Sequence, residues 1–323
     1  MITRVLLVCC LALATGARAE APGEWLQLMN RAFVDLAYDG TFSYFTGNDL
    51  ASLRVVHKVV DGEQRERLVH LNGEAREIVR HGDQVACIVM PGDDLLDIES
   101  SIPAGPFARA FVRGYENIGD LYTVRFDGEE RVAGRNAKRI EVKPRDDFRF
   151  GYRVWLDETN HMLLRSELMD AAGRRLEIFQ FSHIVFGEDV EDAALGQMDA
   201  EGAMVSHLSL GEPSEPLGVS RVPWQAGWLP QGFIMSAADL RSTPAKLKNV
   251  HALVYSDGLA AFSVFIEAMP EAGAAPMHRR VGATVSTSTK LAGDNGEWYL
   301  VTLVGEVPDE TAKRVLENLQ PAA

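Results

Sequence analysis

The strongest constraint on the fold is a long series of short segments in which apolar and polar residues alternate, punctuated by turn signals. The turn signals are the dipeptides Asp61-Gly62, Asn72-Gly73, His81-Gly82, Pro91-Gly92, Asp127-Gly128 and Ala172-Gly173. Glycine supplies the positive φ angles of tight hairpin turns, and period-two alternation indicates strands with one buried face. The predicted strands cover residues 41–46, 53–60, 64–71, 75–80, 84–90, 121–126, 137–143, 148–157, 162–169 and 176–185. About ten consecutive strands predict one large antiparallel sheet that is strongly curved or partly closed.

Helical patterns and a charged segment complete an α+β architecture. Apolar residues at helical spacing from Trp25 to Leu36 predict one helix, and the segment 107–115 predicts a second, short one. Residues 188–216 are rich in acidic residues, Pro and Gly and lack apolar periodicity, which is typical of a linker. A second strand-rich region follows and ends in a helix that begins near Pro308. We expect a leader at 1–19, an N-terminal domain at 20–205, a linker at 206–220 and a smaller antiparallel α+β domain at 221–323.

The first 19 residues have the pattern of a secretory signal peptide. Arg4 supplies the positive start, residues 5–14 form an apolar stretch, and Ala17-Arg18-Ala19 matches a cleavage site. Lipidation of Cys9 or Cys10 is the weaker alternative, because the apolar run before them is very short. After cleavage a single cysteine remains, Cys87, and its apolar neighbours favour a buried and inert thiol.

Composition and missing motifs disfavour several classes of function. With 32 Lys and Arg against 46 Asp and Glu, the formal charge is −14, which disfavours a nucleic-acid partner. The chain has no nucleophile elbow, zinc-protease motif or P-loop, and no two of its 8 histidines have the helical metal-ligand spacing. We therefore predict no catalytic residue, no metal and no cofactor. Asp93, Asp94, Asp97 and Glu99 are interpreted as a charged loop, because they lack calcium-loop spacing.

One apolar strand face is a candidate lipid slot. In segment 148–157 the residues on one side are aromatic or aliphatic, and Arg149, Arg153 and Asp157 point the other way. Such a face usually forms protein core, but a cavity between the sheet and the helices could instead accept an acyl chain. The candidates for that cavity are Phe42, Tyr44, Phe107, Phe111, Phe148, Phe150, Tyr152 and Leu156.

A bias toward arginine suggests recognition of anions. Of the 21 basic residues between 20 and 205, 18 are Arg, whose guanidinium group binds carboxylate and phosphate with two hydrogen bonds. Arg65 and Arg67 share one strand face, as do Arg76 and Arg80 on the next predicted strand. A hairpin at 72–73 would bring the four together as a patch for an anionic headgroup or an acidic peptide. Surface salt bridges are the alternative.

Several segments resemble the MucB/RseB family. Similarity to its C-terminal domain is carried by 255–267, by Val285-Ser-Thr-Ser288, and by Val304-Gly-Glu-Val-Pro308 with Thr311-Ala-Lys-Arg314. The run Trp228-Leu-Pro-Gln-Gly-Phe233 fits the start of that domain. The Trp25 helix and Tyr38-Asp-Gly-Thr-Phe-Ser-Tyr44 resemble the N-terminal domain of the same family. The resemblance covers nearly the whole chain after the leader.

This resemblance implies a periplasmic regulator of an envelope-stress sigma factor. Such a protein binds the periplasmic part of a transmembrane anti-sigma factor, shields it from the initiating protease, and is released by lipopolysaccharide or another lipid. It also implies a large domain like LolA and LolB, a half-barrel sheet covered by helices. We expect the partner surface on the smaller domain and the facing side of the larger one, and the sequence leaves a homodimer open. The alternatives are a periplasmic lipid or lipoprotein carrier of the LolA/LolB type and a hydrolase with an unrecognised site.

Overall fold

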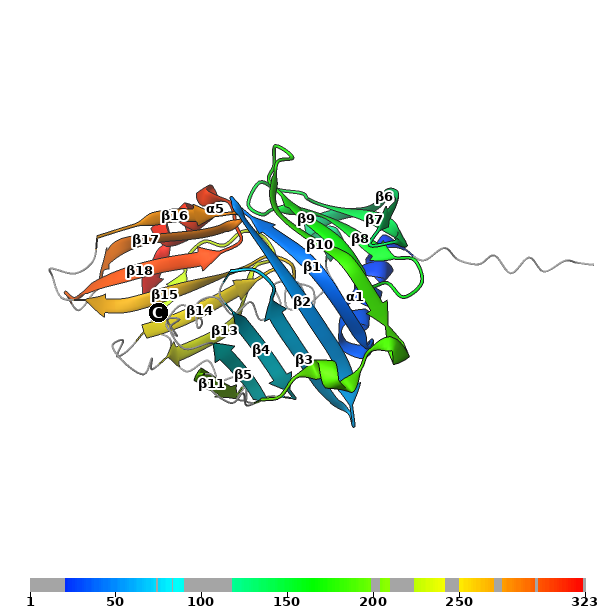
Figure 1. Ribbon diagram of the computed structural model, residues 1–323. Coiled ribbons are helices and arrows are strands. Elements are labelled where there is room, and N and C mark those ends of the chain that lie inside the picture. Colours follow the sequence, from blue (N-terminus) through cyan, green and yellow to red (C-terminus); the bar gives the residue numbers. More distant parts are fainter. Residues whose placement is uncertain are drawn as a thin grey trace, which may run out of the picture.

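The computed structural model describes residues 21–73, 75–82, 84–89, 118–198, 204–209, 224–241, 250–269, 275–293 and 296–321. Two sheets lie side by side and define two domains, which we call the N-terminal domain (described residues up to 209) and the C-terminal domain (described residues from 224) (Figure 1). The predicted leader at 1–19, the short helix at 107–115 and the charged loop at 93–99 lie outside the described residues.

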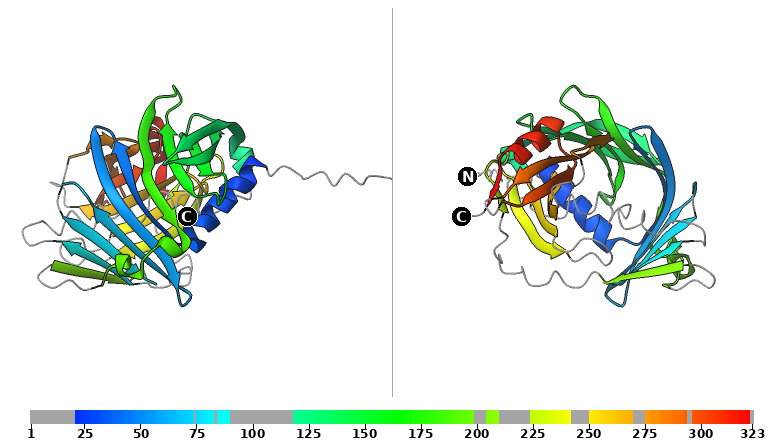
Figure 2. Two further views of the ribbon diagram at one scale, coloured as in Figure 1. Left: turned by 45° about the vertical axis from the view of Figure 1, so that its right-hand side comes forward. Right: turned by 90° about the vertical axis from the view of Figure 1, so that its left-hand side faces the viewer.

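The N-terminal domain is built on an 11-stranded antiparallel sheet. Its strands are β1 (Tyr38–Thr46), β2 (Asp49–Val60), β3 (Glu63–His70), β4 (Arg76–His81), β5 (Gln84–Val89), β6 (Tyr122–Val132), β7 (Arg135–Pro144), β8 (Gly151–Asp157), β9 (Leu163–Met169), β10 (Arg175–Phe186) and β11 (Met204–Ser209). The order is β11-β5-β4-β3-β2-β1-β10-β9-β8-β7-β6, so most neighbours are consecutive hairpin strands. The sheet bends into a deep curve (Figure 2). The predicted large curved antiparallel sheet is thus confirmed.

Helix α1 (Pro22–Asp35) lies within the concave side of this sheet (Figure 2). Pro22 suits the first helical turn because its missing N–H would have no partner there, and Glu24 accepts the Ala21 N–H at 2.8 Å. The buried stripe of the helix is Trp25, Leu26, Met29 and Ala32. These side chains share one core with the sheet residues that point inward. Burying this stripe holds the helix in the curve.

The C-terminal domain has a six-stranded antiparallel sheet with its own core. Its strands are β13 (Ile234–Arg241), β14 (Val250–Ser256), β15 (Ala261–Met269), β16 (His278–Val281), β17 (Thr284–Ala292) and β18 (Trp298–Gly305), in the order β13-β14-β15-β18-β17-β16. Helix α5 (Asp309–Glu317) buries Thr311, Ala312, Val315 and Leu316. The short strands β12 (Trp224–Ala226) and β19 (Leu319–Pro321) pair with each other. The predicted smaller antiparallel α+β domain is confirmed.

Several predicted boundaries differ from the structure, and two of them bear on the linker and on the candidate site. Residues 206–209, predicted as the start of the linker, are the last residues of β11, which pairs with β5. The predicted strand at 148–157 begins at Gly151 instead. Asp146 causes the second difference, because its Oδ1 accepts the Phe148 N–H at 3.0 Å and turns the chain just before the strand. Alternation alone could not reveal that side-chain hydrogen bond.

The buried stripe of α1 gives a test of the N-terminal core. We expect Met29→Ala to lower the free energy of unfolding by about 2–5 kcal/mol, because it removes a fully buried side chain and leaves a cavity. Gln27→Ala, at an exposed position of the same helix, should change it by less than about 0.5 kcal/mol. Urea unfolding followed by circular dichroism measures both. Equal effects of the two substitutions would show that α1 does not carry this core.

Candidate functional site

Two of the predicted slot residues lie on the concave face of the large sheet. Phe42 and Tyr44 are on β1, on the same side as the core residues Phe179 and Phe181 of β10. The ring of Phe42 lies 4.8 Å from that of Phe179 and 5.7 Å from that of Phe181. Phe42 and Tyr44 both keep part of their surface exposed. They are therefore the candidates best placed to contact a ligand on the concave face.

The other slot candidates have different positions. Tyr152 and Leu156 point inward from β8, but both are buried in the core. Phe148 and Phe150 precede β8 and contact the C-terminal domain, and Phe150 is also buried in the same core as Tyr152 and Leu156. Their assignment to the slot stays a prediction. Phe107 and Phe111 lie outside the described residues. Tyr152 and Leu156 therefore form protein core, which was the alternative to a lipid cavity.

Phe148 and Phe150 meet aromatic and cationic groups of the C-terminal domain. The Phe148 ring lies 5.1 Å from that of Trp228, and the Arg314 guanidinium lies 4.1 Å from the Trp228 ring. Thr311 Oγ1 donates a hydrogen bond to the Phe148 carbonyl oxygen at 2.9 Å. The Arg280 guanidinium lies 5.7 Å from the Phe150 ring. These residues of the turn before β8 therefore form part of the interface between the domains.

The four candidate arginines do not form one patch. Arg80 of β4 pairs with Glu66, which lies between Arg65 and Arg67 on β3. Directly paired residues share a sheet face and successive residues alternate, so Arg76 and Arg80 lie on the face opposite to Arg65 and Arg67. A two-residue turn at 72–73 would shift the register between β3 and β4 by one residue and would place all four arginines on the same face. Their role in binding anions stays a prediction.

The register differs because Asn72 is bound to another strand. Its Oδ1 accepts the Ser52 N–H at 2.6 Å, and its Nδ2 donates to the Leu50 carbonyl at 3.1 Å. Asn72 is therefore tied to β2 and does not close a tight turn between β3 and β4. The resulting register gives Arg67 an internal partner, since its guanidinium binds both carboxylate oxygens of Glu77, at 2.6 and 2.8 Å.

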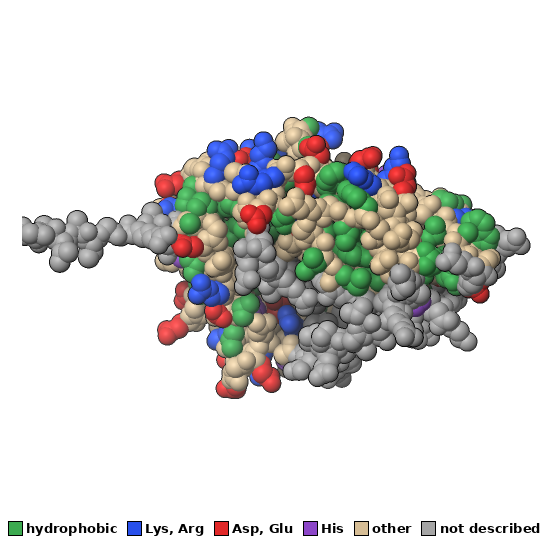
Figure 3. All heavy atoms as spheres, turned by 180° about the vertical axis from the view of Figure 1, so that it is seen from behind, with side chains coloured by type: hydrophobic (Ala, Val, Ile, Leu, Met, Phe, Trp, Pro, Cys, Tyr) green, Lys and Arg blue, Asp and Glu red, His purple; other side chains and the backbone are tan. Residues whose placement is uncertain are grey.

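Many other arginines of this domain are held in ion pairs on the outer face of the sheet. Arg125, Glu141, Arg153 and Glu167 follow one another across β6, β7, β8 and β9, so the signs of charge alternate along the row. Arg125 lies 2.7 Å from Glu141. On the face drawn in Figure 3, Lys and Arg side chains are likewise intermixed with Asp and Glu. The salt-bridge alternative therefore accounts for these arginines.

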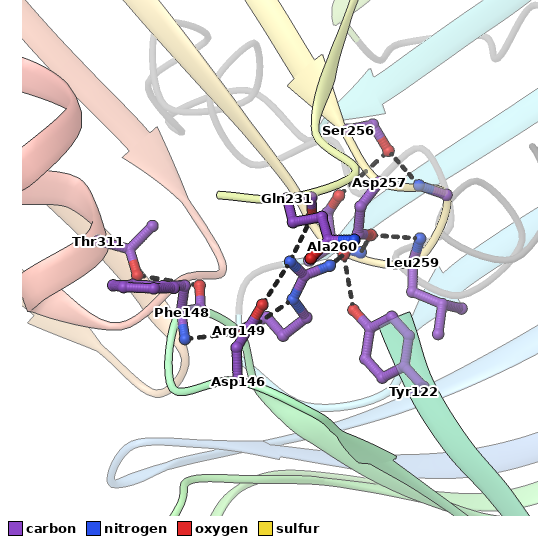
Figure 4. A network of polar contacts seen from close by, with 11 residues as sticks. Tyr122, Asp146, Phe148, Arg149, Gln231, Ser256, Asp257, Leu259, Ala260 and Thr311 are labelled. Carbon is purple, nitrogen blue, oxygen red and sulfur yellow. Dashed lines mark hydrogen bonds and ion pairs between the residues drawn. The ribbon is translucent and has the colours of Figure 1, made fainter. Parts of the chain in front are cut away.

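A buried ion pair at the domain interface was not predicted from the sequence. Arg149 of the N-terminal domain binds Asp257 of the C-terminal domain, and both side chains are 0% exposed (Figure 4). Arg149 also binds Asp146 at 2.8 Å and donates to the Gln231 carbonyl at 2.6 Å. Tyr122 Oη donates to Asp257 Oδ2 at 2.8 Å. The pair thus sits in a network drawn from both domains.

The hydrogen-bond partners in this network stabilise the buried ion pair. Burial by itself would lower the pKa of Arg149, but the hydrogen bond with Asp146 and the charge of Asp257 raise it above its ordinary value. Asp257 Oδ1 also accepts the backbone N–H groups of Leu259 and Ala260, at 2.8 and 2.7 Å. A buried charge pair is tolerated only when its remaining polar atoms are satisfied in this way.

Apolar contacts close the interface around the polar network. Leu259 and Ala283 of the C-terminal domain are buried in the core of the N-terminal domain. Gly282 has a φ of +57°, and a Cβ there would lie 2.2 Å from Thr46 Oγ1. No other residue fits at this position without moving the two domains apart.

The sequence carried only an indirect signal for this site. The alternation pattern places Arg149 on the polar side of a strand, and Asp257 lies in a turn between β14 and β15. An arginine flanked by Phe148 and Phe150 was the one available hint, because a charge among aromatic residues is often buried with a partner. Nothing in the chain identified Asp257 as that partner, more than a hundred residues away.

The described part of the chain holds no group of three or more His, Cys, Asp and Glu side chains arranged to bind a metal ion. In the same part, none of the helices has the length and apolar character needed to cross a membrane.

The buried pair gives a second test. We expect Arg149→Met to lower the free energy of unfolding by about 3–5 kcal/mol, because it leaves Asp257 buried without its counter-charge. Arg153→Met is the matched control, since that side chain is 35% exposed and its acidic neighbours are 3.7 Å or more away, so its cost should stay below about 1 kcal/mol. In a double-mutant cycle in urea, Arg149→Met with Asp257→Asn should cost less than the sum of the single changes. Additive effects would contradict the coupling.

The comparisons with known proteins cover both domains. The family model for the MucB/RseB N-terminal domain matches residues 21–199, and that for the MucB/RseB C-terminal domain matches residues 219–320. The sigma factor AlgU regulatory protein MucB of Pseudomonas aeruginosa is 34% identical over 320 residues, which cover 99% of this chain and 97% of MucB. The sigma-E factor regulatory protein RseB of Escherichia coli K12 is 30% identical over 310 residues, covering 95% of this chain and 93% of RseB.

Solved structures agree with this assignment. The crystal structure of MucB in complex with MucA(peri) has a TM-score of 0.75 and 31% identity, covering 94% of this chain and 99% of that one. The crystal structure of MucB has a TM-score of 0.66 and 31% identity, covering 93% of this chain and 98% of that one. Both domains and nearly the whole length are shared, and so the chain belongs to the MucB/RseB family.

Proposed function

We propose that this protein binds the periplasmic part of a transmembrane anti-sigma factor and shields it from proteolysis, thereby regulating a sigma factor. The observation that carries the proposal is similarity along the full chain to MucB, which has been crystallised with MucA(peri). A match of one domain alone would support only a shared fold. The TM-score is also higher for that complex than for MucB alone, which supports a partner-binding arrangement of the two domains.

The protein is proposed to act in the periplasm, where the partner's exposed segment lies. The signal-peptide pattern at 1–19 supports this location. We place the partner surface on the C-terminal domain and on the facing side of the N-terminal domain. The buried contacts between the domains support this choice, because they hold the two surfaces in one fixed relation.

Release by lipopolysaccharide or another lipid is the second part of the proposal. Phe42 and Tyr44 support it, because they are partly exposed apolar groups on the concave face. Arg76 and Arg80 share that face and are the arginines placed to meet a phosphorylated headgroup. Tyr44 also donates a hydrogen bond to Glu177 Oε2 at 2.5 Å, and Glu177 binds the C-terminal domain. A ligand that moves Tyr44 would therefore disturb the contact between the domains. Such a ligand would bind the closed and the separated arrangement of the domains with different affinities.

A protection assay tests the binding proposal. We expect the purified protein to slow cleavage of the partner's periplasmic segment by the initiating protease, and lipopolysaccharide to restore cleavage. Protein with Arg76→Gln and Arg80→Gln should protect equally well but need about tenfold more lipopolysaccharide, because two headgroup cations are lost. Arg125→Gln with Arg174→Gln is the control for loss of two positive charges at exposed positions. A lack of protection would contradict the regulator and favour a lipid carrier, which should bind lipid without the partner.

A cross-link tests whether release needs movement of the domains. A Cβ at position 47 would lie 3.7 Å from Val281 Cγ1, so Gly47→Cys and Val281→Cys are within reach of a disulfide between the domains. With Cys87→Ser in the background, the oxidised protein should still protect the partner but resist release by lipopolysaccharide. The reduced protein and the two single-cysteine proteins are the controls. If the oxidised protein releases the partner as readily as the reduced one, domain movement is not the mechanism.

A further inference from the structure

A carboxylate of the N-terminal domain forms a direct hydrogen bond to the backbone of the C-terminal domain. Glu177 of β10 accepts the Ala283 N–H at 2.9 Å through Oε1. The same side chain accepts the Tyr44 hydroxyl at 2.5 Å and the Thr46 hydroxyl at 3.3 Å. Glu177 is itself only 5% exposed. Three hydrogen-bond donors therefore converge on one buried side chain at the contact between the domains.

A second carboxyl group enters this corner from the C-terminal domain. Glu306 follows Gly305 at the end of β18, and Gly305 pairs with Val285 of β17. That register places Glu306 beside Thr284, the neighbour of the residue whose N–H binds Glu177. A Cβ at Gly282 would lie 2.7 Å from Glu177 Oε1, so the turn before β17 packs tightly against the first carboxylate. The register and the electrostatic influence of Glu177 on Glu306 thus place two acidic residues from different domains near each other where the domains touch.

We propose that this carboxyl pair makes the contact between the domains sensitive to pH: the closed arrangement keeps a proton on Glu306, and its loss weakens the contact. The reason is electrostatic, because two neighbouring carboxylates at the contact between the domains cannot both ionise without repulsion and lost hydration. The inference concerns the protein alone and does not require a partner or a lipid.

The titration of Glu306 agrees with this geometry and fixes the direction of the effect. Burial, and then the negative charge of Glu177, raise the pKa of Glu306 from its ordinary 4.5 to about 7. When the domains separate, the pKa returns toward the ordinary value. The closed arrangement therefore binds more protons than the separated one between pH 4.5 and 7. Closure is favoured at low pH, and that advantage is lost as the pH rises through about 7.

The aromatic groups around the corner stay neutral over this range. Burial and the charge of Glu177 raise the pKa of Tyr44 above its ordinary value, so its hydroxyl remains a donor. Burial and the charge of Glu306 do the same for Tyr152 of β8. Neither residue can supply a positive charge that would stabilise two carboxylates.

The cations of the flanking elements are bound to other groups. Arg280 of β16 lies 2.8 Å from Asp309 and donates to the Ala283 carbonyl at 3.1 Å. Arg149 of the turn before β8 is paired with the buried Asp257. On β10 itself, the neighbouring cation is Arg175, which lies 3.0 Å from Glu167. The carboxyl pair therefore keeps its mutual repulsion.

A distance measurement on the full chain tests the proposal. Spin labels on cysteines at Gln27 of α1 and Lys313 of α5, both exposed, report the separation of the domains in a Cys87→Ser background. Between pH 5 and pH 8 the ratio of separated to closed protein should rise on the order of fiftyfold, as follows from a pKa of about 7 in the closed arrangement and 4.5 in the separated one. Glu306→Gln, which mimics the protonated acid, should remove most of this dependence and keep the domains closed at pH 8.

Controls and a second measurement make the outcome decisive. Glu310→Gln, at an exposed position of α5, should leave the pH dependence of the unsubstituted protein unchanged. Glu177→Gln should also weaken the pH dependence, because it removes the repelling charge. In urea, Glu306→Gln should raise the unfolding midpoint at pH 8 more than at pH 5. The proposal is overturned if the label distance does not change between pH 5 and 8, or if Glu306→Gln leaves that change and the urea midpoints as they were.

Discussion

The buried pair of Arg149 and Asp257 is the interaction on which the two-domain arrangement depends. Each charge has left water completely, so neither domain could hold its half of the network at low cost if the other were absent. Tyr122 and Asp146 on one side and the Gln231 carbonyl on the other complete the hydrogen bonds. Such a pair adds little net stability compared with apolar packing, but it defines one relative position for the domains because misplacement leaves a charge without a partner.

Close packing at the interface also fixes the relative position of the two domains. Leu259 and Ala283 enter the core of the N-terminal domain, and Gly282 lets the backbone approach Thr46 where any side chain would collide. The interface therefore has an ionic network at one place and a tight backbone contact with a carboxyl pair at another. Both must separate for the domains to move, and they differ in chemistry. One is insensitive to pH near neutrality because arginine stays protonated, whereas the other contains a group that titrates there.

Local patterns in the sequence predicted the strands and helices well, because hairpin glycines and alternation act over a few residues. They failed where a side chain redirected the backbone. Asp146 turned Phe148 and Arg149 away from the predicted strand, and Asn72 bound β2 so that the β3–β4 register moved by one residue. That single step separated Arg76 and Arg80 from Arg65 and Arg67. The partner of Arg149 could not be predicted from the sequence, because a contact between distant segments produces no periodic pattern in a single sequence.

The positions of Tyr44 and Glu177 link the concave face to the domain interface. Tyr44 is partly exposed on the face where a ligand would lie, and its hydroxyl shares Glu177 with the Ala283 N–H. A switch needs a ligand that distinguishes two arrangements, and a tyrosine that contacts both the ligand face and the interface carboxylate provides such a difference. Displacement of its hydroxyl would remove one of the three hydrogen-bond donors of Glu177 and so weaken the contact that Glu177 makes with the C-terminal domain. Ligand and proton would then act on the same contact, so their effects on domain closure are coupled.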